Sequence, residues 1–100
     1  MKITSSELRK LTSILLDYLE NNGLNNIEIM DDFYWAIPVD DLYDPLKDPD
    51  ISKLTLGKLT DEYEFLQRIS KDKSLTTMQA FVWLAAILRN IGNRQTLGGL

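Results

Sequence analysis

The 100-residue sequence contains no cysteine and no histidine. Without cysteine, the chain has no disulfides, no thiolate nucleophile and no thiolate-bound zinc or iron–sulfur cluster. Without histidine, it has no imidazole general base, no histidine-activated nucleophile and no histidine-bound metal. We therefore expect a protein that is not an enzyme and that has no cofactor. The lack of cysteine also suits a reducing compartment.

Long apolar runs are missing as well. The longest apolar stretch lies near residues 78–88 and is about half as long as the roughly 20 residues that span a bilayer. Polar and charged side chains, among them Ser5, Glu7 and Arg9, interrupt the start of the chain, so it does not resemble a signal peptide. These features predict a cytoplasmic protein with no membrane contact.

The composition is that of an ordinary globular chain. Apolar residues make up 44% of the sequence and charged residues 26%, and 100 residues suffice for one domain with its own core. We expect a single globular domain over residues 1–92, followed by a flexible tail at 93–100 in which Gly98 and Gly99 weaken regular structure.

Charge is distributed unevenly along the sequence. Residues 31–50 contain seven aspartates and one lysine, a net charge of −6, whereas residues 71–100 contain four basic residues and one acidic residue, a net charge of +3. Charge asymmetry of this kind bears on partners rather than on fold. Four basic residues are few for binding a phosphate backbone, so we expect no direct contact with nucleic acid and instead a basic protein as partner.

The first predicted element is a helix over residues 5–22. Thr4 and Glu7 form a capping-box pattern, and leucines at positions 8, 11 and 15 follow at helical spacing. Gly23 is a typical helix stop.

Residues 27–37 alternate apolar and polar side chains with a period of two, which predicts β-structure. Asp31 and Asp32 can form the turn of a hairpin that joins 27–30 to 33–37. Alternatively, the segment is one strand that pairs with residues such as Leu54–Leu56 or with another chain. The alternation puts Phe33 and Trp35 on one face, which we interpret as the core face, and Tyr34 on the other.

Two further helices are predicted after residue 58. Thr60 is a plausible N-cap for the first of them, and Thr76 with Gln79 forms a capping box for the second. The last helix is apolar nearly all round, which is typical of a central helix. The predicted fold class is α+β, in the order helix, β-hairpin or single strand, long acidic loop and two helices. The alternative is a mostly α three-helix domain in which 27–37 pairs with the same segment of a second copy.

The acidic loop over residues 39–53 is the most unusual segment. Pro45 and Pro49 disfavour regular structure within it. Residues 40–51 do not fit an EF-hand loop, because Leu42 takes the third position and both the central glycine and the closing glutamate are absent. Three interpretations remain open: a solvated loop, a surface for a protein partner, and a site for calcium or magnesium.

Aromatic side chains beside these acids suggest a contact patch for a basic partner, through cation–π contacts and ion pairs to its arginines and lysines. The candidate partner-binding residues are Tyr34, Asp40, Asp41, Tyr43 and Asp44. No residue is assigned as catalytic or metal-binding. We expect a small acidic protein-interaction module of the inhibitor or immunity type that covers a basic partner surface, and the pattern also allows a homodimer. The alternative is a metal- or small-ligand-binding domain that uses the Asp-rich loop.

Three short motifs, YWAIP, LYDP and LTLGKLTDEYEFL, lie between residues 33 and 68. Their combination resembles a family of small bacterial proteins of unassigned function. The resemblance implies a stand-alone bacterial domain of this size and implies no catalytic residues.

Overall fold

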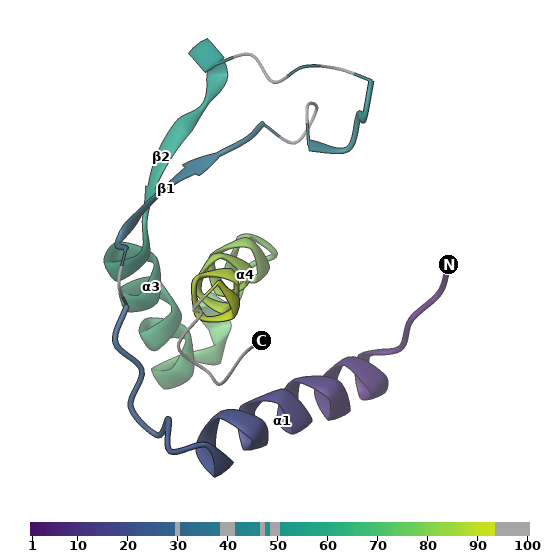
Figure 1. The fold of residues 1–100 in the computed structure, drawn as a ribbon, viewed down its shortest axis with the longest axis vertical. Coiled ribbons are helices and arrows are strands. Elements are labelled where there is room, and N and C mark those ends of the chain that lie inside the picture. The colour runs from purple at the N-terminus through teal and green to yellow at the C-terminus, as the bar shows by residue number, and fades with distance from the viewer. Residues whose placement is uncertain (30, 39–41, 47, 49–50, 94–100) are drawn as a thin grey trace. The chain divides into compact units, whose positions relative to one another are not determined.

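The computed structural model describes residues 1–29, 31–38, 42–46, 48 and 51–93. The chain divides into two compact units, and each is described by itself. The first contains residues 1–28 and the second spans Ile29–Arg94. In chain order the elements are α1 (Ser5–Asn21), β1 (Phe33–Ala36), η1 (Ile51–Lys53), β2 (Thr55–Lys58), α3 (Leu59–Lys71), η2 (Lys73–Leu75) and α4 (Gln79–Gly92) (Figure 1).

The predicted α+β class is confirmed, and the mostly α alternative is wrong, because β1 and β2 form an antiparallel pair within one chain. The prediction of one domain over residues 1–92 stays a prediction. The predicted tail at 93–100 lies almost wholly outside the described residues.

Helix α1 makes up most of the first unit, and both of its ends are capped by local residues. The Thr4 hydroxyl oxygen accepts a hydrogen bond from the Glu7 backbone amide at 3.0 Å. At the other end Gly23 has a φ of +81°, and the amide of Leu24 donates to the carbonyl of Leu19 at 2.9 Å. These are the bonds of a Schellman motif, which glycine permits because it lacks a Cβ. The predicted helix bounds are therefore confirmed to within one residue.

Strand β1 pairs with β2 and not with residues 27–30. In the antiparallel register Phe33 lies opposite Lys58, and Trp35 lies opposite Leu56. The hairpin with a turn at Asp31 and Asp32 is thus wrong. Of the second interpretation, the pairing near residues 54–56 is confirmed, but the strand covers only Phe33–Ala36 and not the whole of 27–37. The acidic loop is the connection between the two strands (Figure 1).

Asp32 caps helix α3 from 28 positions away in the sequence. Its carboxylate Oδ1 accepts hydrogen bonds from both the backbone amide and the hydroxyl of Thr60, each at 2.8 Å, and its carbonyl accepts from the amide of Leu59 at 2.8 Å. The first amides of a helix have no partner inside the helix, so an outside acceptor stabilises it. The prediction that Thr60 is the N-cap is wrong, since α3 already begins at Leu59.

Helices α3 and α4 pack against each other through an aromatic stack. The rings of Phe65 and Trp83 lie 5.2 Å apart at an interplanar angle of 20°, and the Arg68 guanidinium lies 5.1 Å from the Phe65 centroid. The side-chain amide of Asn90 also donates to the Asp31 carbonyl at 3.1 Å. These contacts join α4 to α3 and to the segment that leads into β1.

The predicted N-terminal cap of α4 is wrong. The helix begins at Gln79, and the Thr76 hydroxyl donates to the Lys73 carbonyl instead of forming a capping box. Within the second unit none of the residues of α4 is buried and Phe81 is 66% exposed, so the central position expected for this helix stays a prediction. Within the second unit, the buried apolar residue among those described is Leu59, 3% exposed, at the junction of β2 and α3.

Replacing Asp32 by alanine is expected to lower the melting temperature, because two Thr60 donors lose their acceptor. The hydrogen bond from the Thr60 hydroxyl, above all, lowers the pKa of Asp32 below the ordinary value of an aspartate. The carboxylate therefore contributes stability above that value, and the contribution is lost as the pH falls through the folded-state pKa.

The matched control is Asp31→Ala, which removes the same charge from the neighbouring position. The Asp31 side chain is exposed, and only its backbone carbonyl is bonded among the described residues. Thermal unfolding followed by circular dichroism at neutral and acidic pH compares the two variants. Equal melting temperatures would show that Asp32 does not act as a cap.

Candidate functional site

The two strands place a row of apolar side chains on one face of the hairpin. Phe33 is 56% exposed, Trp35 67% and Leu56 58%, and side chains two residues apart on a strand share a face. Lys58 lies on the same face, opposite Phe33, with its Nζ 5.8 Å from the centroid of the Phe33 ring. We call these four residues the outer hairpin face.

Tyr34 lies on the opposite face and is anchored in the structure. It pairs with Gly57, and its ring occupies the space that a Cβ on residue 57 would fill. Its hydroxyl donates to Oε1 of Glu62 in α3 at 2.6 Å. Burial, followed by the hydrogen bond and the charge of Glu62, raises the pKa of Tyr34 to about 12. Through this hydrogen bond the protonated Tyr34 hydroxyl holds the hairpin to the first turn of α3.

The interpretation of Phe33 and Trp35 as core residues is wrong. The side of the strand that faces α3 is the Tyr34 side, because Gly57 leaves room there for a ring and Glu62 accepts from its hydroxyl. Glycine inside a strand often marks a close approach by another group. That signal was present in the sequence, and it points to Tyr34 as the inward residue.

The connection between the strands exposes both acidic and apolar side chains. Tyr43 is 81% exposed. Asp44 is also exposed, and its Oδ1 accepts from the amide of Leu46 at 3.1 Å, a local turn of the kind that aspartate favours. Asp40 and Asp41 lie outside the described residues.

The structure separates the candidate residues into two groups. Tyr34 lies on the inner face of the hairpin, whereas Tyr43 and Asp44 lie on the connection, and among the described residues no hydrogen bond or ring contact joins the two groups. Their assignment to partner binding stays a prediction. Sequence reasoning missed Phe33, Trp35 and Leu56 as surface residues, because alternation alone does not say which face is buried.

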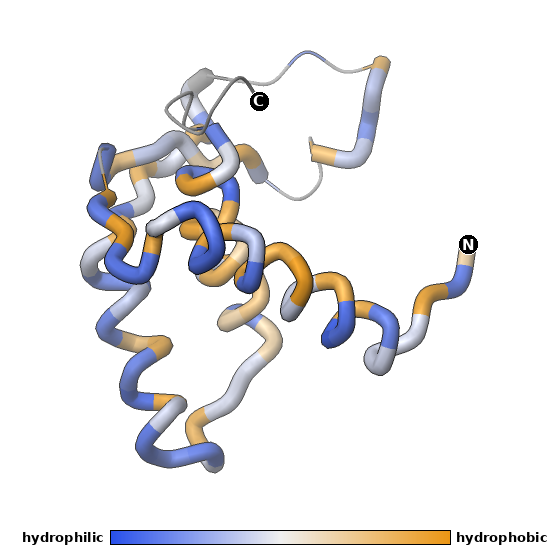
Figure 2. Tube along the Cα trace, turned by 60° about the horizontal axis from the view of Figure 1, so that its bottom comes forward, coloured by the Kyte–Doolittle hydropathy of each residue, from blue (hydrophilic) through white to orange (hydrophobic). Residues whose placement is uncertain are grey.

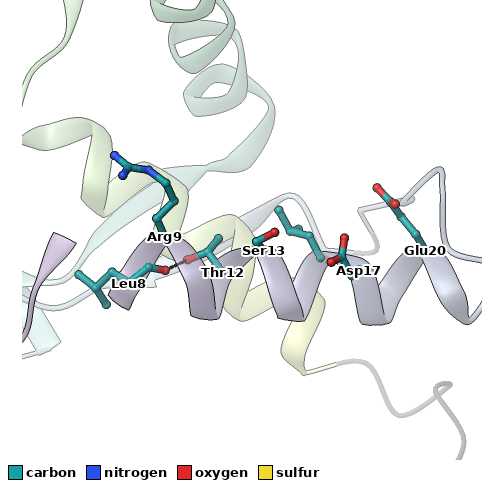
Figure 3. Close-up of a pocket in the computed structure, with 7 residues that line it drawn as sticks. Leu8, Arg9, Thr12, Ser13, Asp17 and Glu20 are labelled. Atoms are coloured by element: carbon teal, nitrogen blue, oxygen red, sulfur yellow. Dashed lines mark hydrogen bonds between the residues drawn. The ribbon is translucent and has the colours of Figure 1, made fainter. Parts of the chain in front are cut away.

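A shallow hollow along α1 is a weaker candidate. It is lined by Leu8, Arg9, Thr12, Ser13, Leu16, Asp17 and Glu20. Figure 3 shows these side chains on one helix, and the Thr12 hydroxyl donates to the Leu8 carbonyl at 2.7 Å. Figure 2 shows polar and apolar residues alternating along this helix from the N-terminal label inward. All the lining residues belong to a single helix, which forms one wall and does not enclose a ligand.

The described part of the chain contains no metal site of the usual kind, since no group of three or more acidic side chains is arranged there to hold a metal ion. Since Asp40, Asp41 and Asp50 lie outside it, the metal- or ligand-binding alternative stays a prediction. No helix in the described ranges is long and apolar enough to cross a membrane.

The anchor of Tyr34 predicts a loss of stability at high pH. A pKa raised from 10.0 to about 12 means that the folded protein keeps the proton more tightly than the unfolded chain. The contribution is complete below pH 10 and is lost as the pH rises from 10 towards 12. Chemical unfolding across this range is expected to show a steeper loss for the native protein than for Tyr34→Phe. Parallel curves for the two proteins would exclude the anchor.

Gly57→Ala is expected to destabilise the second unit by about 1–3 kcal/mol, because the new methyl group overlaps the Tyr34 ring. Combining it with Tyr34→Ala removes the overlap, so the two changes together should cost less than their sum. The control is Gly92→Ala at the end of α4, where a Cβ meets nothing within 4 Å. Additive costs in urea unfolding would contradict the close packing.

Comparison with known proteins finds no relative of this chain. No family model, no curated protein and no solved structure matches the chain. The resemblance to small bacterial proteins of unassigned function therefore stays a prediction.

Proposed function

We propose that the protein is a small acidic interaction module that binds a basic surface of a partner protein in the cytoplasm, in the manner of inhibitors or immunity-type proteins. One observation carries the proposal. The outer hairpin face exposes Phe33, Trp35 and Leu56, and two of these residues belong to a segment, residues 31–50, with a net charge of −6.

Apolar exposure on this face supports binding. Tryptophan and tyrosine are enriched among the residues that contribute most to interfaces, whereas scattered single apolar residues on a surface are ordinary. Here Trp35 and Leu56 are direct cross-strand partners, and Phe33 lies two residues from Trp35 on the same face. The three side chains thus form one continuous apolar surface that a partner can desolvate.

The preference for a basic partner comes from rings and charges together. Lys58 already places its ammonium group over the Phe33 ring, so this face accepts a cation from its own chain. Trp35 is more exposed than Phe33 and has the better ring for such a contact. The aspartates of the connection supply the complementary charge that steers a basic partner to the face.

The residues of the connection complete the proposed surface at its rim. Tyr43 and Asp44 are exposed there, and Asp40 and Asp41 add charge in the same stretch of sequence. Rim charges affect mainly the rate of association and its salt dependence, whereas a buried aromatic anchor affects mainly dissociation. Tyr34 contributes by holding the hairpin in place.

Affinity capture from the native cell extract tests the proposal. The bait is the wild-type protein, Trp35→Ser, or the triple variant Asp40→Asn/Asp41→Asn/Asp44→Asn, each at low and moderate salt. We expect a basic protein to be retained by the wild type and released as salt rises. We expect Trp35→Ser to shorten the lifetime of the complex and the triple variant to slow its formation.

The matched control is Phe81→Ser, which replaces an equally exposed aromatic residue, 66% exposed, on α4 instead of on the hairpin. Thermal unfolding of each bait confirms that it is folded. If a partner bound all four proteins equally, neither the outer hairpin face nor the acidic connection would be part of the binding surface.

A further inference from the structure

We propose that the partner presents an extended basic segment, which adds to the free edge of β1 as a third strand and lays basic side chains over the outer hairpin face. The inference rests on the proposed function and specifies how the partner is held. It follows from the open edge of β1, from the residues along that edge and from the charge around it.

The edge of β1 is open in the structure. Within the described ranges the sheet contains two strands, so β1 is paired on the side of β2 only. About half of the backbone N–H and C=O groups of such a strand point away from its partner. An unpaired row of this kind is a template for another extended chain.

The residues of β1 do not protect this edge. Natural edge strands are protected by being very short, by lysine or proline, by β-bulges or by inward charges. Strand β1 is short, at four residues, but it reads Phe-Tyr-Trp-Ala and contains no proline and no charged side chain, whereas β2 contains Gly57 and Lys58. Pro38 limits pairing beyond Ile37, because proline lacks the amide that a ladder needs. The open template is therefore short and lies beside Phe33 and Trp35.

The geometry of an added strand places its side chains over the aromatic rings. Side chains on neighbouring strands that share a face lie about 4.5–5.5 Å apart at Cβ. Alternate residues of the added strand therefore lie beside Phe33 and Trp35. Lys58, the cross-strand neighbour of Phe33, already makes this contact from the β2 side. Lysine or arginine at alternate positions of the added strand would make the same cation–π contact with these rings from the β1 side.

Charge decides between a basic partner and a second copy of the chain. Two copies that paired through β1 would bring together two segments that each carry a net charge of −6. Asp31 is exposed just before β1, and Asp44 and Asp48 are exposed on the connection that follows it. Like charges brought together disfavour pairing, whereas a basic strand neutralises them. The occupant is thus a basic extended segment.

The test uses synthetic peptides and the full chain. The probe is a fluorescent peptide of alternating lysine and valine. The first control replaces every lysine by glutamate. Two further controls keep all side chains but carry N-methyl groups at alternate residues, one in each register, so that one of them lacks the amides that face β1. Binding is measured by fluorescence anisotropy, and hydrogen exchange reports the backbone amides of residues 33–36.

We expect the lysine peptide to bind and to weaken as salt rises, and the glutamate peptide not to bind. We expect one of the two N-methylated peptides to bind roughly 30- to 150-fold less tightly, since it loses two or three edge hydrogen bonds of modest net strength. Exchange of the outward-pointing amides in β1 should slow when the lysine peptide is bound.

Three outcomes would overturn the inference. Equal binding of both N-methylated peptides, with unchanged exchange in β1, would mean that the partner touches side chains alone and would leave the proposed function standing. Slow exchange in β1 without peptide, together with a dimer in sedimentation analysis, would assign the edge to a second copy. Failure of every peptide to bind, while Trp35→Ser still weakens capture of the partner, would reject strand addition and retain the outer hairpin face.

Discussion

The arrangement of the second unit depends on how Asp32 binds the first turn of α3. Its carbonyl and carboxylate accept from Leu59 and Thr60, residues that follow directly on β2. Because β1 begins one residue after Asp32, these bonds hold the start of one strand against the end of the other, and Phe33 comes to lie opposite Lys58. A helix cap thus sets the register of a sheet. The connection of residues 37–54 can then be long, since closing a longer loop adds little to its entropic cost.

Register in turn determines which aromatic residues meet solvent. A shift of one residue would turn Tyr34 outward and bring Phe33 and Trp35 inward, because strand side chains alternate. The observed choice places Tyr34 over Gly57 and its hydroxyl on Glu62. A large ring facing inward is compatible with this short hairpin only because residue 57 has no Cβ. The inner face therefore holds one aromatic residue, Tyr34, and Phe33 and Trp35 remain exposed on the outer face.

The sequence predicted those features whose causes are local. Thr4, Glu7 and Gly23 are within a few residues of the ends of α1, and the bounds of that helix were right. The N-terminal cap of α3 was assigned to Thr60 because its partner Asp32 lies 28 positions away, and no pattern of short period reports such a pair. Asp32 and its neighbour Asp31 also resemble a turn, and this resemblance led to the incorrect prediction of a hairpin that joins 27–30 to 33–37. Phe33 and Trp35 were assigned to the core for a related reason, since alternation identifies faces without saying which is buried.

The fold itself does not require the outer hairpin face to be apolar. The hairpin would form with threonine or lysine at positions 33, 35 and 56, residues that suit an exposed strand face and reduce aggregation. Its register is already held by Asp32 and Tyr34, so the exposed rings are not needed to build it. Exposed Phe33 and Trp35 beside the outer edge of β1 are features that favour association with another chain. Under the proposed function, the net charge of −6 in residues 31–50 selects a basic partner over a second copy of the chain, and the apolar side chains are kept on the surface for that contact.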